Sequence, residues 1–201
     1  MSRAASLFTH ALALAWLAAC SALSPQADPT RYFVLIPRAD PTDATGPVTQ
    51  TLGLGPVQVP DDLDEGIVTR LADEEIAISD TERWGEPLRE ALTGVIRQNL
   101  ATLLGPEPIV VYPWRPSAAP DLAVAVEIVH FERTTHGTVE AAARWSIKRR
   151  SATTPIVTSS CSIRGSFRGN DTRAAVAALS VAVAELSGRI AADVRSVTPS
   201  S

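Results

Sequence analysis

Two neighbouring segments of the chain alternate regularly between larger apolar side chains and small or polar ones. From Asp121 to Glu132 a large apolar side chain falls on every second position over most of the run, and Thr138 to Lys148 repeats the alternation. Since side chains along a strand point alternately to its two faces, each segment predicts a strand with one buried face. The short polar stretch from Thr134 to Gly137 predicts that the two strands pair as a long antiparallel hairpin.

Two other segments have the three- and four-residue spacing of amphipathic helices. The first opens at Trp84 to Pro87, with the proline in its first turn, and ends at Gly105-Pro106. The second follows the capping residues Asn170 to Thr172. Its apolar stripe is formed by Val176, Leu179, Val183, Leu186, Ile190 and Val194. Each spacing predicts a helix that lays one face on a sheet.

Shorter apolar runs, bounded by prolines, glycines and charged turns, predict further strands. They lie at 31–36, 52–60, 67–71, 75–79, 109–112 and 156–167. The strands at 67–71 and 75–79 are separated by three residues and should pair as a hairpin. Strands outnumber helices and follow one another in runs. We therefore predict an α+β fold, with a mostly antiparallel sheet and two main helices packed on one face.

The N-terminal segment has a different character. One basic residue, Arg3, precedes 16 uncharged residues, which is short of the ~20 apolar residues that a spanning helix needs. This pattern is typical of a secretory signal peptide. The segment ends in Leu17-Ala18-Ala19-Cys20, which resembles the lipobox of bacterial lipoproteins. In that scheme the signal peptidase recognises the first three of these residues and cuts after Ala19, and Cys20 carries the lipid.

The lipobox interpretation divides the chain into four parts. Residues 1–19 are the signal peptide, 20–30 the lipidated cysteine and a flexible tether, 31–197 a single domain, and 198–201 a loose tail. Two or three acyl chains would hold the protein on a membrane surface. Ser21, in place of the aspartate that retains lipoproteins at the inner membrane, favours the periplasmic face of the outer membrane. The alternative is that Cys20 merely ends an apolar run, with an ordinary cleavage nearby or a retained anchor helix.

The charge of the chain limits its partners. The formal net charge is −4, and loss of the single positive charge of Arg3 makes the mature chain −5. This sign argues against a nucleic-acid partner. It also means that membrane attachment rests on acyl chains and not on a basic surface.

No arrangement of residues predicts catalysis, so we predict that the protein is not an enzyme and uses no metal or cofactor. His130 and His136, six apart across the end of a strand, lack the spacing of metal ligands. Glu127 and Glu140 on facing strands could form a carboxylate pair, although neighbouring basic residues explain them more simply as sheet-surface charges. Cys161 has no neighbouring base, which favours a small buried residue over a nucleophile.

Two tryptophans are candidates for partner binding. Trp84 and Trp114 lie in predicted loops beside prolines, where core packing and recognition of a partner both remain open. Trp145 lies on an apolar strand face, which assigns it to the core. The Gly53-Leu54-Gly55 stretch lacks the third glycine and the following helix of a nucleotide-binding loop.

Several short motifs occur in a recognisable order along the chain. They are Gly55 to Pro60, Ile67 to Arg70, Trp84 to Leu88 at the start of a helix that runs to Leu100, Val111 to Trp114, and Ala177 to Ser187 in the last helix. Together they resemble the ABC-type transport auxiliary lipoproteins of the PqiC-like group, over nearly the whole mature chain. The order and spacing of the motifs carry this resemblance.

The resemblance implies an envelope component that works with Mce-domain proteins and an ABC or related permease to move lipids between the inner and outer membranes. Such a subunit would dock on the periplasmic Mce-domain partner, with a homo-oligomeric ring as one form of assembly. Permease and ATPase subunits would supply the energy and the pore, and no catalytic residues are implied. Two alternatives remain: a structural or assembly lipoprotein of another outer-membrane complex, and a lipid-tethered hydrolase with a Ser or Cys beside His130 or His136.

Overall fold

A computed structural model describes residues 28–44, 48–64, 66–105, 109–169 and 171–198. The predicted signal peptide, the lipobox with Cys20 and most of the tether lie outside the described residues, as does the end of the predicted tail. The strands are β1 (Arg31–Phe33), β2 (Leu52–Gln58), β3 (Val68–Ala72), β4 (Glu75–Ile78), β5 (Glu82–Trp84), β6 (Val110–Val111), β7 (Leu122–Thr134), β8 (Thr138–Arg149) and β9 (Val157–Ser166). The helices are α2 (Asp61–Asp64), α3 (Leu88–Leu104) and α4 (Thr172–Ser196), with short 3-10 turns η1 (Pro41–Asp43) and η2 (Pro116–Ala118).

Strand β7 organises the main sheet. On one edge it pairs antiparallel with β8, which in turn pairs antiparallel with β9. On its other edge the first half of β7 pairs with β2 and the last part with β3, both parallel. Strands β6 and β4 extend this side of the sheet beyond β2 and β3. The long hairpin and the β3–β4 hairpin that the sequence predicts are both confirmed.

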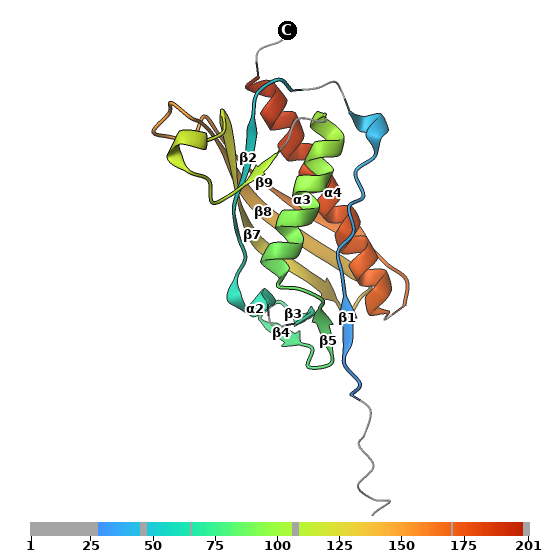
Figure 1. Ribbon diagram of the computed structural model, residues 1–201. Coiled ribbons are helices and arrows are strands. Elements are labelled where there is room, and N and C mark those ends of the chain that lie inside the picture. Colours follow the sequence, from blue (N-terminus) through green and yellow to red (C-terminus); the bar gives the residue numbers. More distant parts are fainter. Residues whose placement is uncertain (1–27, 45–47, 65, 106–108, 170, 199–201) are drawn as a thin grey trace, which may run out of the picture.

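The prediction of a mostly antiparallel sheet is wrong. In the seven-stranded sheet three pairings are parallel (β2 with β6, β2 with β7 and β3 with β7) and three are antiparallel (β3 with β4, β7 with β8 and β8 with β9). Strands β1 and β5 form a separate parallel pair. The sheet is therefore mixed, and it curls around the two long helices as a half-barrel (Figure 1). Alternation along a strand shows which face is buried, but it does not show in which direction a distant neighbour runs.

Both long helices lie on the same side of the sheet (Figure 1). Helix α4 packs on β8 and β9, while α3 packs on β2 and on α4. Proline cannot donate a backbone hydrogen bond, but Pro87 stands at the N-cap of α3, where no such bond is needed. The first helical N–H, that of Leu88, donates to the carboxylate of Asp64 in α2. This contact ties the start of α3 to the segment that follows β2.

Helix α4 is unusually apolar for a helix at the surface of a domain. Its most apolar 18-residue window has a mean hydropathy of 1.5, which by length and composition alone would suffice to cross a membrane. In the fold, 56% of that window is buried. The residues on its inner face, from Val176 to Val194, pack against the sheet and α3 as the predicted stripe requires.

The chain between β1 and η1 crosses the helix pair in an extended form. Polar side chains of the helices hold it there: Ile36 N–H donates to Ser180 Oγ at 3.2 Å, and the N–H groups of Arg38 and Ala39 donate to Asn99 Oδ1 at 3.0 and 3.1 Å. Asn99 is fully buried in α3, and its amide donates to Ser187 Oγ of α4 at 3.3 Å. Buried polar side chains therefore position this segment and join the two helices.

Candidate functional site

An open groove of about 780 Å³ runs between β2 and α3. Its floor is the stretch Leu54–Val59, one wall is the outer side of the first turns of α3 up to Gly94, and the other wall is Val111 and Tyr112. We call it the β2–α3 groove. Most of its exposed surface is apolar, with Arg89 and Glu90 as the charged groups. A groove of this kind suits an apolar segment of a partner, flanked by a few polar contacts.

Two glycines shape the side of this groove that leads to the candidate Trp114. A Cβ at Gly53 would lie 2.4 Å from Pro120 Cγ and 2.9 Å from the Trp114 ring, so the glycine makes room for the indole. Gly55 has φ +119°, which favours glycine, and its Cα faces Tyr112 closely enough that a Cβ would lie 2.8 Å from Tyr112 Cβ. The Gly-x-Gly stretch thus serves the packing of two aromatic residues.

The two candidate tryptophans lie in different surroundings. Trp114 is half-buried in the loop after β6 and packs edge-on against Tyr112, with ring centroids 5.3 Å apart. Trp84 belongs to strand β5, which the sequence analysis missed, and is only 7% exposed, with its ring 5.9 Å from that of Phe131. Trp114 therefore stands beside the groove, whereas Trp84 lies in the core.

The polar residues considered for chemistry are dispersed. His130 is exposed on β7 and His136 lies in the turn that follows, and no group of three metal-ligating side chains occurs among the described residues. Glu127 lies opposite Arg144 and pairs with it at 3.7 Å. Glu140 pairs with Arg164 at 3.5 Å, so Glu127 and Glu140 are not brought together.

Cys161 lies on β9, half-buried beneath α4, and carries a free thiol. Burial raises the pKa of this thiol above its usual value, and the opposing effect of the Arg189 guanidinium is smaller. A raised pKa leaves the sulfur protonated and a poor nucleophile, in keeping with the predicted packing role.

A buried acidic residue was missed by the sequence analysis. A register shift between Ile128 and His130 interrupts the alternation of β7, and Glu132 beyond it is only 3% exposed and opposite Glu140. Arg70 on β3 binds both carboxylate oxygens of Glu132, and this pairing also favours the charged form of Arg70 and raises its pKa. No short-range pattern indicates this pair, because 62 residues separate its members.

The fold is a small α+β domain with an open, mostly apolar groove between β2 and α3. The family model described as ABC-type transport auxiliary lipoprotein component matches residues 33–191, and the chain belongs to this family.

Two solved structures share the fold at low sequence identity. Protein XCC0632 from Xanthomonas campestris is 14% identical, with a TM-score of 0.68 over 80% of this chain and 92% of that chain. The crystal structure of an uncharacterized protein is 20% identical, with a TM-score of 0.67 over 82% of this chain and 98% of that chain. A PelC dodecamer from Paraburkholderia phytofirmans is more distant, at 8% identity and a TM-score of 0.42 over 79% of this chain and 90% of that chain. No curated protein sequence matches the chain.

Proposed function

We propose that the protein is a non-catalytic, lipid-anchored subunit of an Mce-type, ABC-linked system that moves lipids across the cell envelope. In this proposal it docks on a periplasmic Mce-domain partner at the periplasmic face of the outer membrane. The family match over 33–191 is the observation that carries the proposal. The lipobox sequence at Leu17 to Cys20 supports the anchor independently.

The β2–α3 groove is the docking surface in this proposal. It joins an apolar floor to an aromatic pair, and aromatic side chains beside a pocket commonly dominate the binding energy of protein interfaces. Of the two candidate tryptophans, Trp114 would contact the partner directly. Trp84 would act only through the core, because its indole is almost completely covered.

Gly94 offers a sharp test of this surface. It lines the groove from α3, and a Cβ placed on it meets no heavy atom within 4 Å. Gly94→Trp would fill the groove without disturbing the core. Glycine is a poor helix former, so its replacement should not destabilise α3. In this proposal an Mce-domain protein should co-purify with the wild type from gently solubilised membranes, and at least tenfold less with Gly94→Trp.

The matched control is Gly188→Trp on α4, a helical glycine with equally open surroundings on a different surface. It should leave recovery of the partner unchanged. Equal recovery with Gly94→Trp and the wild type would exclude the groove as the docking surface. Capture of other outer-membrane proteins with no Mce-domain protein would favour the assembly-lipoprotein alternative.

The anchor has its own test. Cys20→Ala should leave the domain folded but remove lipid labelling and the processed membrane-bound form. Persistent labelling in this variant would contradict the lipidation of Cys20.

A further inference from the structure

The edge of β2 that faces the β2–α3 groove is paired over only part of its length. Strand β6 pairs with β2 as far as Leu54, whose carbonyl accepts from the Tyr112 N–H at 2.9 Å. Pro56 has no N–H to donate, and the pairing stops before it. Among the described residues, no strand joins this side of Val57 and Gln58, although both pair with β7 on the other side.

This unpaired edge belongs to the floor of the groove. Tyr112 follows β6 directly and forms a wall of the groove, so the groove lies beside β2 where a longer β6 would continue. Successive residues of a strand direct their N–H and C=O groups to opposite sides. One of Val57 and Gln58 therefore directs both groups toward the groove. Unpaired backbone groups at a sheet edge are a template for another extended chain.

The shape of the groove favours an extended segment over a helix. Its floor beyond Leu54 runs from Gly55 to Val59, and an added strand would pair with it residue by residue over about five residues. On the opposite side Gly94 of α3 has no side chain to narrow the groove. A helix is about 10 Å wide and binds its own backbone groups, so it would leave the edge of β2 unpaired.

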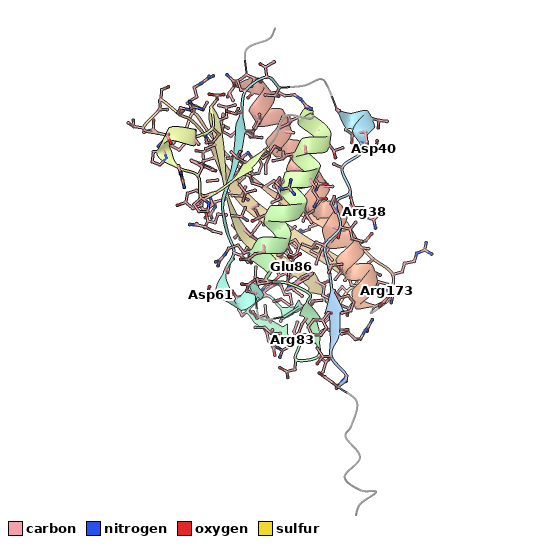
Figure 2. The ribbon with its side chains drawn as sticks, in the orientation of Figure 1. Arg38, Asp40, Asp61, Arg83, Glu86 and Arg173 are labelled. Atoms are coloured by element: carbon pink, nitrogen blue, oxygen red, sulfur yellow. The ribbon has the colours of Figure 1, made fainter. Side chains whose placement is uncertain are left out.

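Acidic side chains surround the end of the groove at which α3 begins. Asp61 and Asp62 follow the floor, Glu86 precedes α3, and Glu90 lies in its first turn. Figure 2 shows Asp61 and Glu86 at this same end of the molecule. All four are exposed, and within the described residues neither they nor the neighbouring Arg89 form an ion pair. The excess of negative charge is complementary to a basic residue of a partner.

We propose that an extended segment of the Mce-domain partner adds a strand to β2 in the β2–α3 groove. The segment is apolar along the groove and carries a basic residue at the end beside Asp61 and Glu86. This inference rests on the proposed function and specifies the form in which the partner binds. Main-chain hydrogen bonds to Val57 or Gln58 give such a complex its affinity, and the alternate side chains of the segment give it specificity.

Hydrogen exchange of single backbone amides tests the added strand without any substitution. The full-length lipoprotein is measured alone in mild detergent and in the complex recovered with the Mce-domain protein. The amide of either Val57 or Gln58 should exchange at least tenfold more slowly in the complex, because it gains a hydrogen-bond partner. The amides of Asp73 and Glu74, in the turn between β3 and β4, are the internal control and should not change.

Charge reversal tests the acidic end of the groove. The double variant Asp61→Lys with Glu86→Lys should reduce recovery of the Mce-domain protein at least fivefold at low salt. The matched control is Glu74→Lys with Glu75→Lys, which makes the same change in charge at exposed positions on another surface and should leave recovery unchanged. Equal recovery with the two double variants would overturn the basic residue in the partner segment.

The outcomes separate this inference from the proposed function. If the Mce-domain protein is recovered but both the Val57 and Gln58 amides exchange as in the free chain, the added strand is overturned and the proposed function stands. Slower exchange confined to the first turns of α3 has the same consequence, since a helix or a lipid chain in the groove would produce it. Recovery of the wild type without any Mce-domain protein would overturn the proposed function, and this inference with it.

Discussion

The two edges of β7 are built in different ways. Along one edge β8 follows after a three-residue turn and pairs antiparallel over nearly the whole strand. Along the other edge β2 and β3 each cover a part, and Leu52 pairs with Leu122, 70 residues further along the chain. The first edge follows from local contacts, whereas the second depends on long-range contacts whose loop-closure entropy must be offset by specific packing.

The antiparallel edge should show the largest effect of a single substitution. Trp145 of β8 is buried, and its Nε1 donates to Asp193 Oδ2 of α4 at 2.9 Å. Trp145→Ala should lower the free energy of unfolding by about 3–5 kcal/mol, because it leaves a large cavity between sheet and helix. Urea unfolding measures the loss. Trp145→Phe, which keeps most of the volume, should lose less than half as much.

The long-range edge depends on the Arg70–Glu132 pair between β3 and β7. Arg70→Ala leaves the Glu132 carboxylate buried without its partner, and breaking a fully buried pair costs about 3–5 kcal/mol. Because the Arg70 side chain is 26% exposed, we expect about 2–3 kcal/mol in urea unfolding.

Replacing both members of the pair tests the cause of that loss. The double variant Arg70→Leu with Glu132→Leu should be more stable than Arg70→Ala, because no charge is left buried. If the double variant is the less stable of the two, the uncompensated charge is not the source of the loss.

Gly53 tests the contact between β2 and the loop after β6. Gly53→Ala should cost about 1–3 kcal/mol through overpacking, since the new methyl group would overlap Pro120 and Trp114. Displacement of the indole should also weaken partner recovery. Gly94→Ala is the control, and it should stabilise the protein by up to about 1 kcal/mol in thermal unfolding.

The smallest expected effect concerns pH at the shared start of β2 and β7. The Asp121 carboxylate accepts from the hydroxyl and the N–H of Thr51 at 2.8 and 3.0 Å, which lowers the pKa of Asp121. Because the pKa of Asp121 is lower in the folded protein, these hydrogen bonds stabilise the fold fully when the pH is well above about 4, the ordinary pKa of an aspartate. This stabilisation is lost as the pH falls below about 4. Asp121→Asn should therefore reduce the pH dependence of the thermal unfolding midpoint between about pH 5 and pH 3. An unchanged slope would contradict this role.

The sequence predicted elements better than their arrangement. The alternation in β7 and β8 and the helical stripe of α4 reflect burial of one face, so their positions and the long hairpin were predictable. Strand β5 was missed because it has three residues and pairs only with β1. The parallel partners of β7 were not predictable, because no local residue pattern encodes the direction of a strand 70 residues away.

The candidate site was predictable only in part. Trp114, beside a proline, is half-buried next to Tyr112, but the same reasoning placed Trp84 in a loop, whereas it lies in the core. The groove itself arises from β2, α3 and β6, which meet only in the folded chain. Residue type and flanking prolines make a tryptophan a candidate for partner binding, but its burial depends on which elements of the fold pack over it.

The composition of the outer side of α4 bears on how the protein behaves when nothing covers that side. Alanine and glycine raise the hydropathy of a helix, yet each leaves little apolar area in contact with water. A stripe of leucines at the same positions would make the uncovered domain prone to aggregate. With methyl groups and bare backbone at these positions, the outer side of α4 exposes less apolar area to water and is less prone to aggregate.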